Sequence, residues 1–510
     1  MLPAIWCNPT LRQLDFRLAS GRGNVFLIRP NHMKKTYLLG LLGAGLLAFR
    51  PAPTPPAALK AEAIQDLQAH YADYRQLAQR IWGFAEVGYK ETQSSALLQK
   101  TLRDHGFAVQ AGVAGIPTAF VATYGSGQPV IGILAEFDAL PGLAQQAVAE
   151  KTPIAGQNAG HGCGHNLFGT ASVATGLELQ KLLKAGKLRG TVKVFGCPAE
   201  EGGSGKVYMV REGLFNGVDA VIHWHPSSEN ATMAGRYIAN SSAKFRFHGI
   251  AAHAAAAPER GRSALDGVEA MDNMVNMMRE HVPQETRIHY VITNGGKAPN
   301  VVPDFAEVYY YVRHPNRADV QAIFERVVKA AEGAALGTGT TMDYEIVGGT
   351  HDLLINETLA HALQTNLEQV GGVTYTPEEM AFGQQIQQSL GAPAPPVAQA
   401  AVVEPYLARD LGGSSDVGDV SYVVPTVGLQ AATWIPGTPA HSWQAVACSG
   451  KEIGSKGMMV AAKTMTLTAI DLFTTPELLT QAKAELKQKV GSYVYKPLLG
   501  DRKPALNYRD

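Results

Sequence analysis

Apolar residues recur at helical spacing in some stretches of the chain and form short continuous runs in others. Residues 60–82, 92–105 and 166–184 have the spacing of helices with one or more apolar faces. Between them lie short apolar runs that are typical of buried strands: 119–124, 130–135, 191–197 and 220–224. Strands that alternate with helices in this way predict an α/β fold whose sheet is covered on both faces.

The pattern changes near residue 242. From there it predicts the order strand, helix, strand, strand, helix, strand, which is that of a ferredoxin-like α+β module. The predicted elements are 244–247, 263–281, 288–294, 305–313, 319–335 and 341–347. After residue 350 the α/β pattern resumes, with a strand at 424–429 and a helix at 458–472. We therefore expect one catalytic domain, residues 59–241 and 353–510, interrupted by a smaller domain at 242–352.

Residues 1–58 form an N-terminal extension outside these domains. Within it, residues 33–50 begin with a methionine and two lysines, and a mostly apolar run follows. That run is shorter than the ~20 residues of a membrane span and is typical of a secretory signal. We expect translation to start at Met33, residues 50–58 to be a Pro/Ala-rich linker, and the protein to be exported to the periplasm. If the segment is unused, the protein would stay in the cytoplasm.

Composition narrows the function. The 510 residues include 44 Lys and Arg and 44 Asp and Glu, so the formal net charge is zero. Nucleic-acid-binding proteins normally carry a basic surface, so we expect no nucleic-acid partner. The cysteines are too few and too scattered for a disulfide framework: Cys7, Cys163, Cys197 and Cys448.

Candidate metal ligands occur in four short segments. The first is His161-Gly-Cys163-Gly-His165, at the start of a predicted helix. Imidazole and thiolate groups bind ions such as Zn²⁺, and a helix N-terminus favours the thiolate form of cysteine. Taken alone, the segment could also be a loop whose histidines have no such role.

The second segment holds two adjacent carboxylates, Glu200 and Glu201, just after the strand at 191–197. Adjacent residues of an extended chain point in opposite directions. One carboxylate could therefore bind an ion while the other faces the bound water as a general base. A solvated acidic turn is the alternative.

The remaining segments supply further histidines. His223 and His225 share one face of a predicted strand, so both could bind an ion, or one could support the other. His441 stands alone, far along the chain. The four segments together place His, Cys and Glu at the ends of α/β strands, where such sheets bind their ligands. A shared metal site explains them better than four coincidences.

Five motifs along the chain together resemble the di-metal amidohydrolases of the aminoacylase/carboxypeptidase type: HGCGHN, PAEEGGSGK, GIAAHAAAAPERGRSALD, APNVVPD and GGSSDVGDVS. The resemblance covers about residues 60–475 and is strongest to the branch formed by the aminobenzoyl-glutamate hydrolases. It implies a zinc-peptidase-like catalytic domain with a mixed sheet, and an inserted lid that mediates dimerisation. It also implies two divalent ions in each protomer, Zn²⁺ or Mn²⁺, and a homodimer or a heteromer with a related chain.

The resemblance also implies roles for single residues. Glu200 becomes the general base, and the metal ligands are Cys163, His165, Glu201, His225 and His441. Cys163 takes the bridging position, where many relatives have an aspartate. Asp138 and His161 would support the ligands without binding metal themselves. His223 departs from the pattern of the indole-acetyl-amino-acid hydrolases, which leaves the choice between His223 and His225 open, with His225 favoured.

In the lid, the resemblance suggests that His253 reaches the active site of a neighbouring protomer and stabilises the oxyanion. Asn300 and Arg313 would hold the carboxylate of the substrate, the arginine by a bidentate contact. A turn-capping asparagine and an arginine on the strand surface are the alternatives. Asp416 could face the substrate or form a turn.

We therefore expect a metal-dependent hydrolase of an amide bond in a small N-acyl amino acid, such as aminobenzoyl-glutamate, or in a dipeptide-like substrate. Water activated by the metal would attack the amide carbonyl, with Glu200 as the base. One alternative is a thiol amidase that uses Cys163 with a histidine. Another is an inactive binding relative, which would have no need for Glu200.

Overall fold

The computed structural model describes residues 56–408 and 412–509. The proposed start at Met33 and signal segment 33–50 lie outside the described residues. Helix α1 already begins at Pro56, so the last part of the linker expected at 50–58 is helical. Among the described residues, no helix combines the length and the apolar character needed to cross a membrane.

The single helix predicted at 60–82 is in fact two helices, α1 (Pro56–Ala69) and α2 (Tyr71–Phe84). Between them His70 has φ −96° and ψ 14°, which ends the regular helical geometry. Buried residues continue at helical spacing on both sides of this one-residue break, so apolar spacing alone could not reveal it.

Within the described residues, seven strands form the main sheet in the order β1-β2-β6-β3-β7-β13-β8. Their bounds are β1 Ala108–Ala111, β2 Phe120–Ser126, β6 Gly190–Cys197, β3 Val130–Glu136, β7 Ala220–Ser227, β13 Thr426–Ala432 and β8 Ala231–Thr232. The four strands β6, β3, β7 and β13 are parallel, and the outer pairings are antiparallel. The sheet is therefore mixed, as the resemblance implied.

Helices cover both faces of this sheet. The larger core includes α1, α2, α3 (Thr92–Asp104), α4 (His165–Lys184), α8 (Glu357–Val370), α12 (Glu452–Thr474) and α13 (Pro476–Val490). The other face packs against α5 (Gly205–Arg211) and α10 (Val417–Ser421). On β3, Ile131 and Ile133 belong to the larger core and Leu134 to the other. This alternation buries both faces of the central strands.

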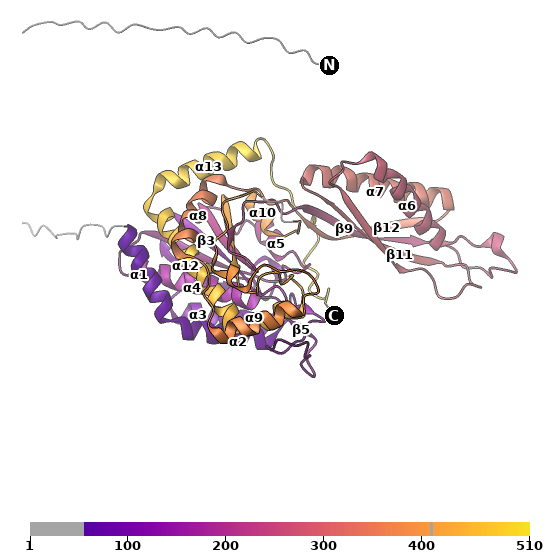
Figure 1. Ribbon diagram of the computed structural model, residues 1–510. Helices are drawn as coiled ribbons and strands as arrows, with labels where there is room; N and C mark the ends of the chain where they lie inside the picture. The colour runs from indigo at the N-terminus through magenta and orange to yellow at the C-terminus, as the bar shows by residue number, and fades with distance from the viewer. Residues whose placement is uncertain (1–55, 409–411, 510) are drawn as a thin grey trace, which may run out of the picture. The chain divides into compact units, whose positions relative to one another are not determined.

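The inserted domain has the predicted order of elements. It comprises β9 (Ala239–His248), α6 (Ala264–Met278), β10 (Arg287–Asn294), β11 (Phe305–His314), α7 (Arg317–Thr338) and β12 (Thr341–Thr350). In the described residues its strands form an antiparallel sheet, β10-β11-β9-β12, whose core faces α6 and α7 (Figure 1). The ferredoxin-like prediction is confirmed. β9 begins at Ala239, and the domain limits 242–352 stay a prediction.

Two further helices lie after the inserted domain, α9 (Pro377–Gln388) and α11 (Trp443–Ser449). They share a small apolar cluster that includes Ile386, Trp434 and Cys448. This cluster lies beside the loop that carries His441, and α11 begins two residues after it. The main role of this region for the site is therefore to hold that loop.

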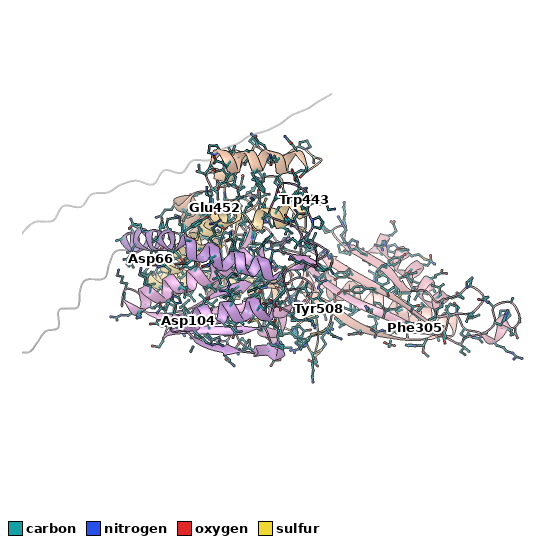
Figure 2. All side chains as sticks on the ribbon, turned by 90° about the horizontal axis from the view of Figure 1, so that it is seen from below. Asp66, Asp104, Phe305, Trp443, Glu452 and Tyr508 are labelled. Carbon is teal, nitrogen blue, oxygen red and sulfur yellow. The ribbon has the colours of Figure 1, made fainter. Side chains whose placement is uncertain are left out.

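One buried carboxylate makes the stability of the fold depend on pH. Glu178 of α4 is 2% exposed, and burial together with a hydrogen bond to Asp66 of α1 (labelled in Figure 2) raises its pKa to about 9. The ordinary value is 4.5. Between these pH values folding takes up a proton, so the free energy of unfolding falls as pH rises.

We expect Glu178→Gln to raise the free energy of unfolding by about 2 kcal/mol at pH 8, because the variant has no proton to take up. At pH 4.5 the gain should be close to zero, since folded and unfolded glutamate then differ little in protonation. Urea unfolding at the two pH values measures both numbers. Equal gains at pH 4.5 and pH 8 would contradict the shifted pKa.

Candidate active site

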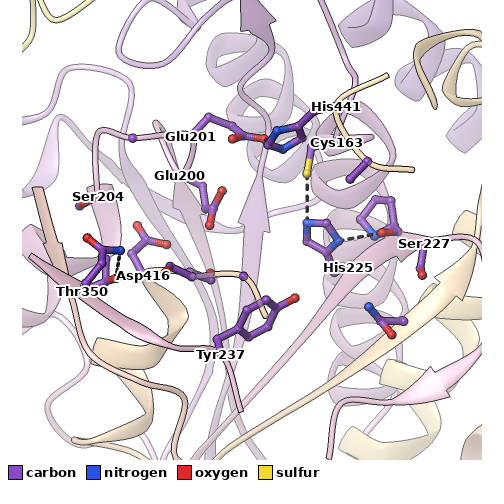
Figure 3. Close-up of a pocket in the computed structure, with 18 of the residues that line it drawn as sticks. Cys163, Glu200, Glu201, Ser204, His225, Ser227, Tyr237, Thr350, Asp416 and His441 are labelled. Carbon is purple, nitrogen blue, oxygen red and sulfur yellow. Dashed lines mark hydrogen bonds and ion pairs between the residues drawn. The ribbon is translucent and has the colours of Figure 1, made fainter. Parts of the chain in front are cut away.

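The carboxyl ends of β3, β6 and β7 meet at one edge of the main sheet, and the predicted site residues gather there. The Cys163 segment leads into α4, the two glutamates follow β6, and His225 lies near the end of β7. The loop before α11 joins them, since the main-chain N–H of His441 donates to the Gly162 carbonyl at 2.9 Å. One cavity of about 560 Å³ is lined by Cys163, Glu200, Glu201, His225 and His441 (Figure 3).

The side-chain donors of this edge form three overlapping groups of possible metal ligands. The atoms of each group lie within 4.8 Å of one another. The groups are Cys163, His165 and His225; Cys163, Glu201 and His441; and Glu136, His165 and Glu200. Cys163 is common to the first two, and its Sγ lies 3.3 Å from Nε2 of His225. The structure thus brings together all five predicted ligands and the predicted base.

Three of these ligand atoms are buried and lack a hydrogen-bond partner in the described structure: Oε2 of Glu136, Nε2 of His165 and Oε1 of Glu201. They face other donors, since His165 Nε2 is 3.2 Å from Glu136 and Glu201 Oε1 is 3.1 Å from Nε2 of His441. Buried ligand-type atoms that face one another suit bound cations. Thiolate, imidazole and carboxylate are the donors that zinc takes in proteins. The residues present therefore fit metal binding.

Asp138 supports two of the predicted ligands from outside the cavity. Its Oδ1 lies 2.9 Å from Nδ1 of His165, and its Oδ2 accepts the main-chain N–H of Glu201 at 2.9 Å. A carboxylate on one ring nitrogen fixes the imidazole so that the other nitrogen can bind metal. This geometry agrees with the supporting role implied for Asp138.

His161 and His223 are buried outside the ligand groups found in the described residues. Nε2 of His161 lies 3.1 Å from the carbonyl of Ile81 in α2. The ring of His223 packs on Gly428 of β13, where it leaves no room for a Cβ atom. Burial lowers the pKa of each to about 3, so both are neutral. Of the two histidines on β7, the geometry favours His225 as the ligand.

A buried ion pair behind the site was not predicted from the sequence. Lys206 of α5 is completely buried, and its Nζ lies 2.6 Å from both Glu136 and Asp416. Its main-chain N–H also donates to Asp416, at 2.8 Å. Asp416 lines the cavity (Figure 3), but its carboxylate is held by Lys206. The PAEEGGSGK motif contains Lys206, yet a lysine in a sequence gives no sign of its burial.

The two adjacent glutamates differ in their electrostatic surroundings. Burial raises the pKa of Glu200, and the charges of Glu136 and Glu201 raise it further. Burial also acts on Glu201, but its ion pair with His441 and the charge of His165 hold its pKa below the usual value. A carboxylate with a raised pKa suits a general base, and a neighbour that stays ionised suits a metal ligand.

The surroundings of Cys163 argue against a thiol nucleophile. Burial raises the pKa of its thiol, and the charges of Glu201 and Glu200 add to the shift, although His165 opposes it. A catalytic cysteine needs a lowered pKa, because the thiolate is the nucleophile. Here the thiolate is favourable only when a cation lies beside it.

The backbone is strained around these side chains. Three residues have left-handed backbone conformations that residues other than glycine rarely adopt: Ala199 (φ 56°), Ser204 (φ 59°) and His441 (φ 58°). Each costs on the order of 1 kcal/mol, and such strain is concentrated at functional sites. Two of these residues flank the turn that presents Glu200 and Glu201.

The predicted lid residues divide into two sets. Arg313 lines the cavity, where its Nε is buried without a hydrogen-bond partner among the described residues. His253 and Asn300 are exposed and do not line it. They lie near the start of β11, whereas Arg313 is near its end. Within one chain, therefore, the structure does not bring His253 and Asn300 to the site.

Comparisons with known proteins agree with this fold. The family described as "Peptidase dimerisation domain" matches residues 240–338. The B subunit of the p-aminobenzoyl-glutamate hydrolase of Escherichia coli K12 is 42% identical over 456 residues, which cover 84% of this chain and 95% of that protein. The Xaa-Arg dipeptidase of Mus musculus is 30% identical over 431 residues, which cover 81% of this chain and 89% of that protein.

A solved structure shows the same fold. A dinuclear metal binding peptidase from the M20 family, of Bacillus subtilis, has a TM-score of 0.56 and 17% sequence identity. The similarity covers 80% of this chain and 99% of that chain. With the long match to an amidohydrolase and the dimerisation domain inside the catalytic fold, the chain belongs to the M20 family of metal-dependent peptidases and amidohydrolases.

Proposed function

We propose that the protein hydrolyses the amide bond of an N-acyl amino acid of the p-aminobenzoyl-glutamate type with two divalent ions, Zn²⁺ or Mn²⁺. The observation that carries the proposal is the cavity in which Cys163, Glu201, His225 and His441 surround the space beside Glu200. The relative with 42% identity is named for p-aminobenzoyl-glutamate, which supports this substrate class. The raised pKa of Cys163 favours metal chemistry over a thiol amidase.

Two divalent ions held by Cys163, His165, Glu201, His225 and His441 would lower the pKa of a water molecule and polarise the amide carbonyl. Glu200 lines the cavity next to these groups and would take a proton from that water as it attacks the carbonyl carbon. Glu200 would then give the proton to the amide nitrogen as the C–N bond breaks. The products are the free acid and the amine, and Glu200 returns to its starting state.

An assay of p-aminobenzoyl-glutamate cleavage tests this function. We expect the protein to release p-aminobenzoate, to lose this activity when a chelator removes its metal, and to regain it with Zn²⁺ or Mn²⁺. A thiol amidase would stay active in the chelator, and a binding relative would hold the compound without cleaving it. Other acyl-glutamates, acyl-aromatic amino acids and β-alanyl dipeptides, assayed in parallel, would define the acyl group and the leaving amino acid.

Arg313 is proposed to bind the carboxylate of the substrate. We expect Arg313→Met to raise KM for p-aminobenzoyl-glutamate about 30-fold, because it removes a charge-assisted hydrogen bond, and to change kcat far less. Arg313→Lys should give an intermediate KM, since lysine keeps the charge but loses the bidentate geometry. Steady-state kinetics measure both. An unchanged KM in the methionine variant would place the carboxylate elsewhere.

We infer that the inserted domain forms a homodimer through its edge strand β10. Tyr290, Val291 and Ile292 of this strand are 37%, 56% and 40% exposed. An exposed apolar edge strand presents free N–H and C=O groups to another strand. The match to a peptidase dimerisation domain supports this assembly. His253 would then reach the cavity of the partner, as the resemblance implies.

Val291→Asp is expected to convert the dimer into a monomer, because a charge would be buried at the strand pairing. Sedimentation of the purified chain and of the variant at the same concentration measures the change in mass. Glu285→Asp, which keeps the charge at an exposed position just before β10, is the matched control. A wild-type chain that stays monomeric would point instead to a heteromer with a related chain.

We also propose that the protein is exported to the periplasm by residues 33–50. Fractionation of cells that express the full sequence is expected to place a shortened protein in the periplasm. Recovery of the uncleaved chain in the cytoplasm would contradict this proposal.

A further inference from the structure

The chain does not end at α13 but continues as a tail, residues 491–509, that contacts the inserted domain. Arg502 donates through Nη1 to the carbonyls of Ile346 and Val347 in β12, at 2.6 and 2.5 Å. Its Nη2 lies 3.6 Å from Glu345 on the same strand. Leu498 packs on Gly349, where it leaves no room for a side chain. The tail is therefore tied to the strand by which the inserted domain ends.

The middle of the tail is held by helix α5, which follows the turn of Glu200 and Glu201. Arg211 of α5 donates to the carbonyls of Gly500 and Arg502, at 3.3 and 2.7 Å. Tyr208, one turn earlier, donates to the carbonyl of Lys503 at 3.4 Å. These contacts direct the last residues of the tail toward the candidate active site.

The end of the tail contacts a predicted metal ligand. The hydroxyl of Tyr508 (labelled in Figure 2) donates to the main-chain carbonyl of Glu201 at 3.0 Å, and Nη2 of Arg509 donates to the same oxygen at 2.5 Å. The ring of Tyr508 packs edge-on against Tyr89, with centroids 5.5 Å apart. Tyr89 in turn donates to the carbonyl of Gly203, at 2.6 Å, in the same turn.

The main chain of Glu201 is thus fixed on both sides. Asp138 accepts its N–H, and Tyr508 and Arg509 donate to its C=O. Because the turn is strained at both of its ends, it needs such contacts to keep one conformation. With the backbone fixed, only the side-chain torsions of Glu201 remain, and its carboxylate meets His441.

We propose that Tyr508 and Arg509 are positioning residues that hold Glu201 in its metal-binding geometry, so that the C-terminal tail is part of the active site. The inference rests on the proposed function, since it takes Glu201 to be a metal ligand. Groups that orient a ligand from behind commonly change metal affinity by about 10- to 100-fold when they are removed. The tail also connects this ligand to β12 through Arg502.

The test compares four full-length proteins loaded with Zn²⁺: the wild type, Tyr508→Phe/Arg509→Gln, Arg509→Lys and Lys503→Gln. The double variant removes both donors to the Glu201 carbonyl, and Arg509→Lys keeps a donor and the charge. Lys503→Gln is the matched control, because it removes a positive charge from an exposed residue of the same tail. The rate at which zinc passes to a chelating dye is measured first, and then kcat and KM.

We expect zinc release from the double variant to be about 10-fold faster than from the wild type, with a lower kcat and a KM within about twofold. Arg509→Lys should lie close to the wild type, and Lys503→Gln should match it. Equal release rates in all four proteins would overturn the inference. So would a fall of the metal-free melting temperature of the double variant by more than about 5 °C, which would assign the tail a general role in stability.

The zinc measurement does not depend on the substrate. If the wild type binds zinc and the double variant releases it faster, but no acyl amino acid is cleaved, the proposed function fails and the role of the tail stands. If the wild type cleaves p-aminobenzoyl-glutamate and the double variant releases zinc at the wild-type rate, the role of the tail fails alone.

Discussion

Glu200→Gln is expected to lower kcat by about 10³- to 10⁴-fold while the protein stays folded and keeps its metal. Glutamine has nearly the same shape as glutamate but cannot accept the proton of the attacking water, and general-base catalysis contributes about 10²- to 10⁴-fold. The carboxylate lies in the cavity beside the ligand groups, and its raised pKa suits a proton carrier. Steady-state kinetics with p-aminobenzoyl-glutamate give kcat, and elemental analysis gives the metal content.

Glu212→Gln is the matched control, because it removes a carboxylate from an exposed position at the end of α5. Its kcat should equal that of the wild type. A Glu200→Gln protein with full metal content and a kcat within about threefold of the wild type would show that another group moves the proton. Loss of metal together with activity would instead make Glu200 a ligand, as its place in the third donor group allows.

Lys206→Met is expected to lower the free energy of unfolding by about 3–5 kcal/mol. The variant leaves Glu136 and Asp416 buried without their common cation, and removing one partner of a buried ion pair has an effect of this size. Methionine has about the volume of the lysine stem, so the lost free energy of unfolding comes from the missing charge rather than from poorer packing. Urea unfolding of the metal-free proteins measures it.

Two further variants separate the loss of the buried positive charge from other effects of the substitution. Lys184→Met changes an exposed lysine at the end of α4 and should alter stability by less than about 0.5 kcal/mol. Adding Glu136→Gln and Asp416→Asn to Lys206→Met should restore part of the lost stability, because the two neutral amides need no cation. A loss below about 1 kcal/mol in Lys206→Met alone would show that water reaches this pair.

Most of the architecture could be predicted from the sequence, because each central element has a clear local pattern. β3 is buried at every residue and β6 at every residue except Lys193, so both are recognisable as mostly apolar runs. In the inserted domain, buried and half-buried residues alternate strictly along β11. By contrast, α13 buries only Leu479 and Ala482, so its apolar stripe is too narrow to recognise.

The site was predictable as far as residue type and position on a strand determine it. The sequence could not show whether His223 or His225 faces the other metal ligands, because both histidines lie on one side of β7 and only their neighbours differ. The roles of Lys206, Tyr508 and Arg509 depend on contacts with Asp416 and Glu201 that are 210, 307 and 308 positions away. No local pattern contains such contacts.

The inserted domain is attached along one edge. β9 leads into it and β12 leads out, the two strands pair with each other, and Asn240 lies opposite Thr350 with a side-chain hydrogen bond of 2.9 Å. The tail residues Leu498 and Arg502 also contact β12, so the strand pair and the tail together hold the inserted domain beside the cavity. Arg313 and Thr350 of the inserted domain both line the cavity. A substrate that reaches from Arg313 to the ligand groups would therefore connect the inserted domain to the catalytic domain.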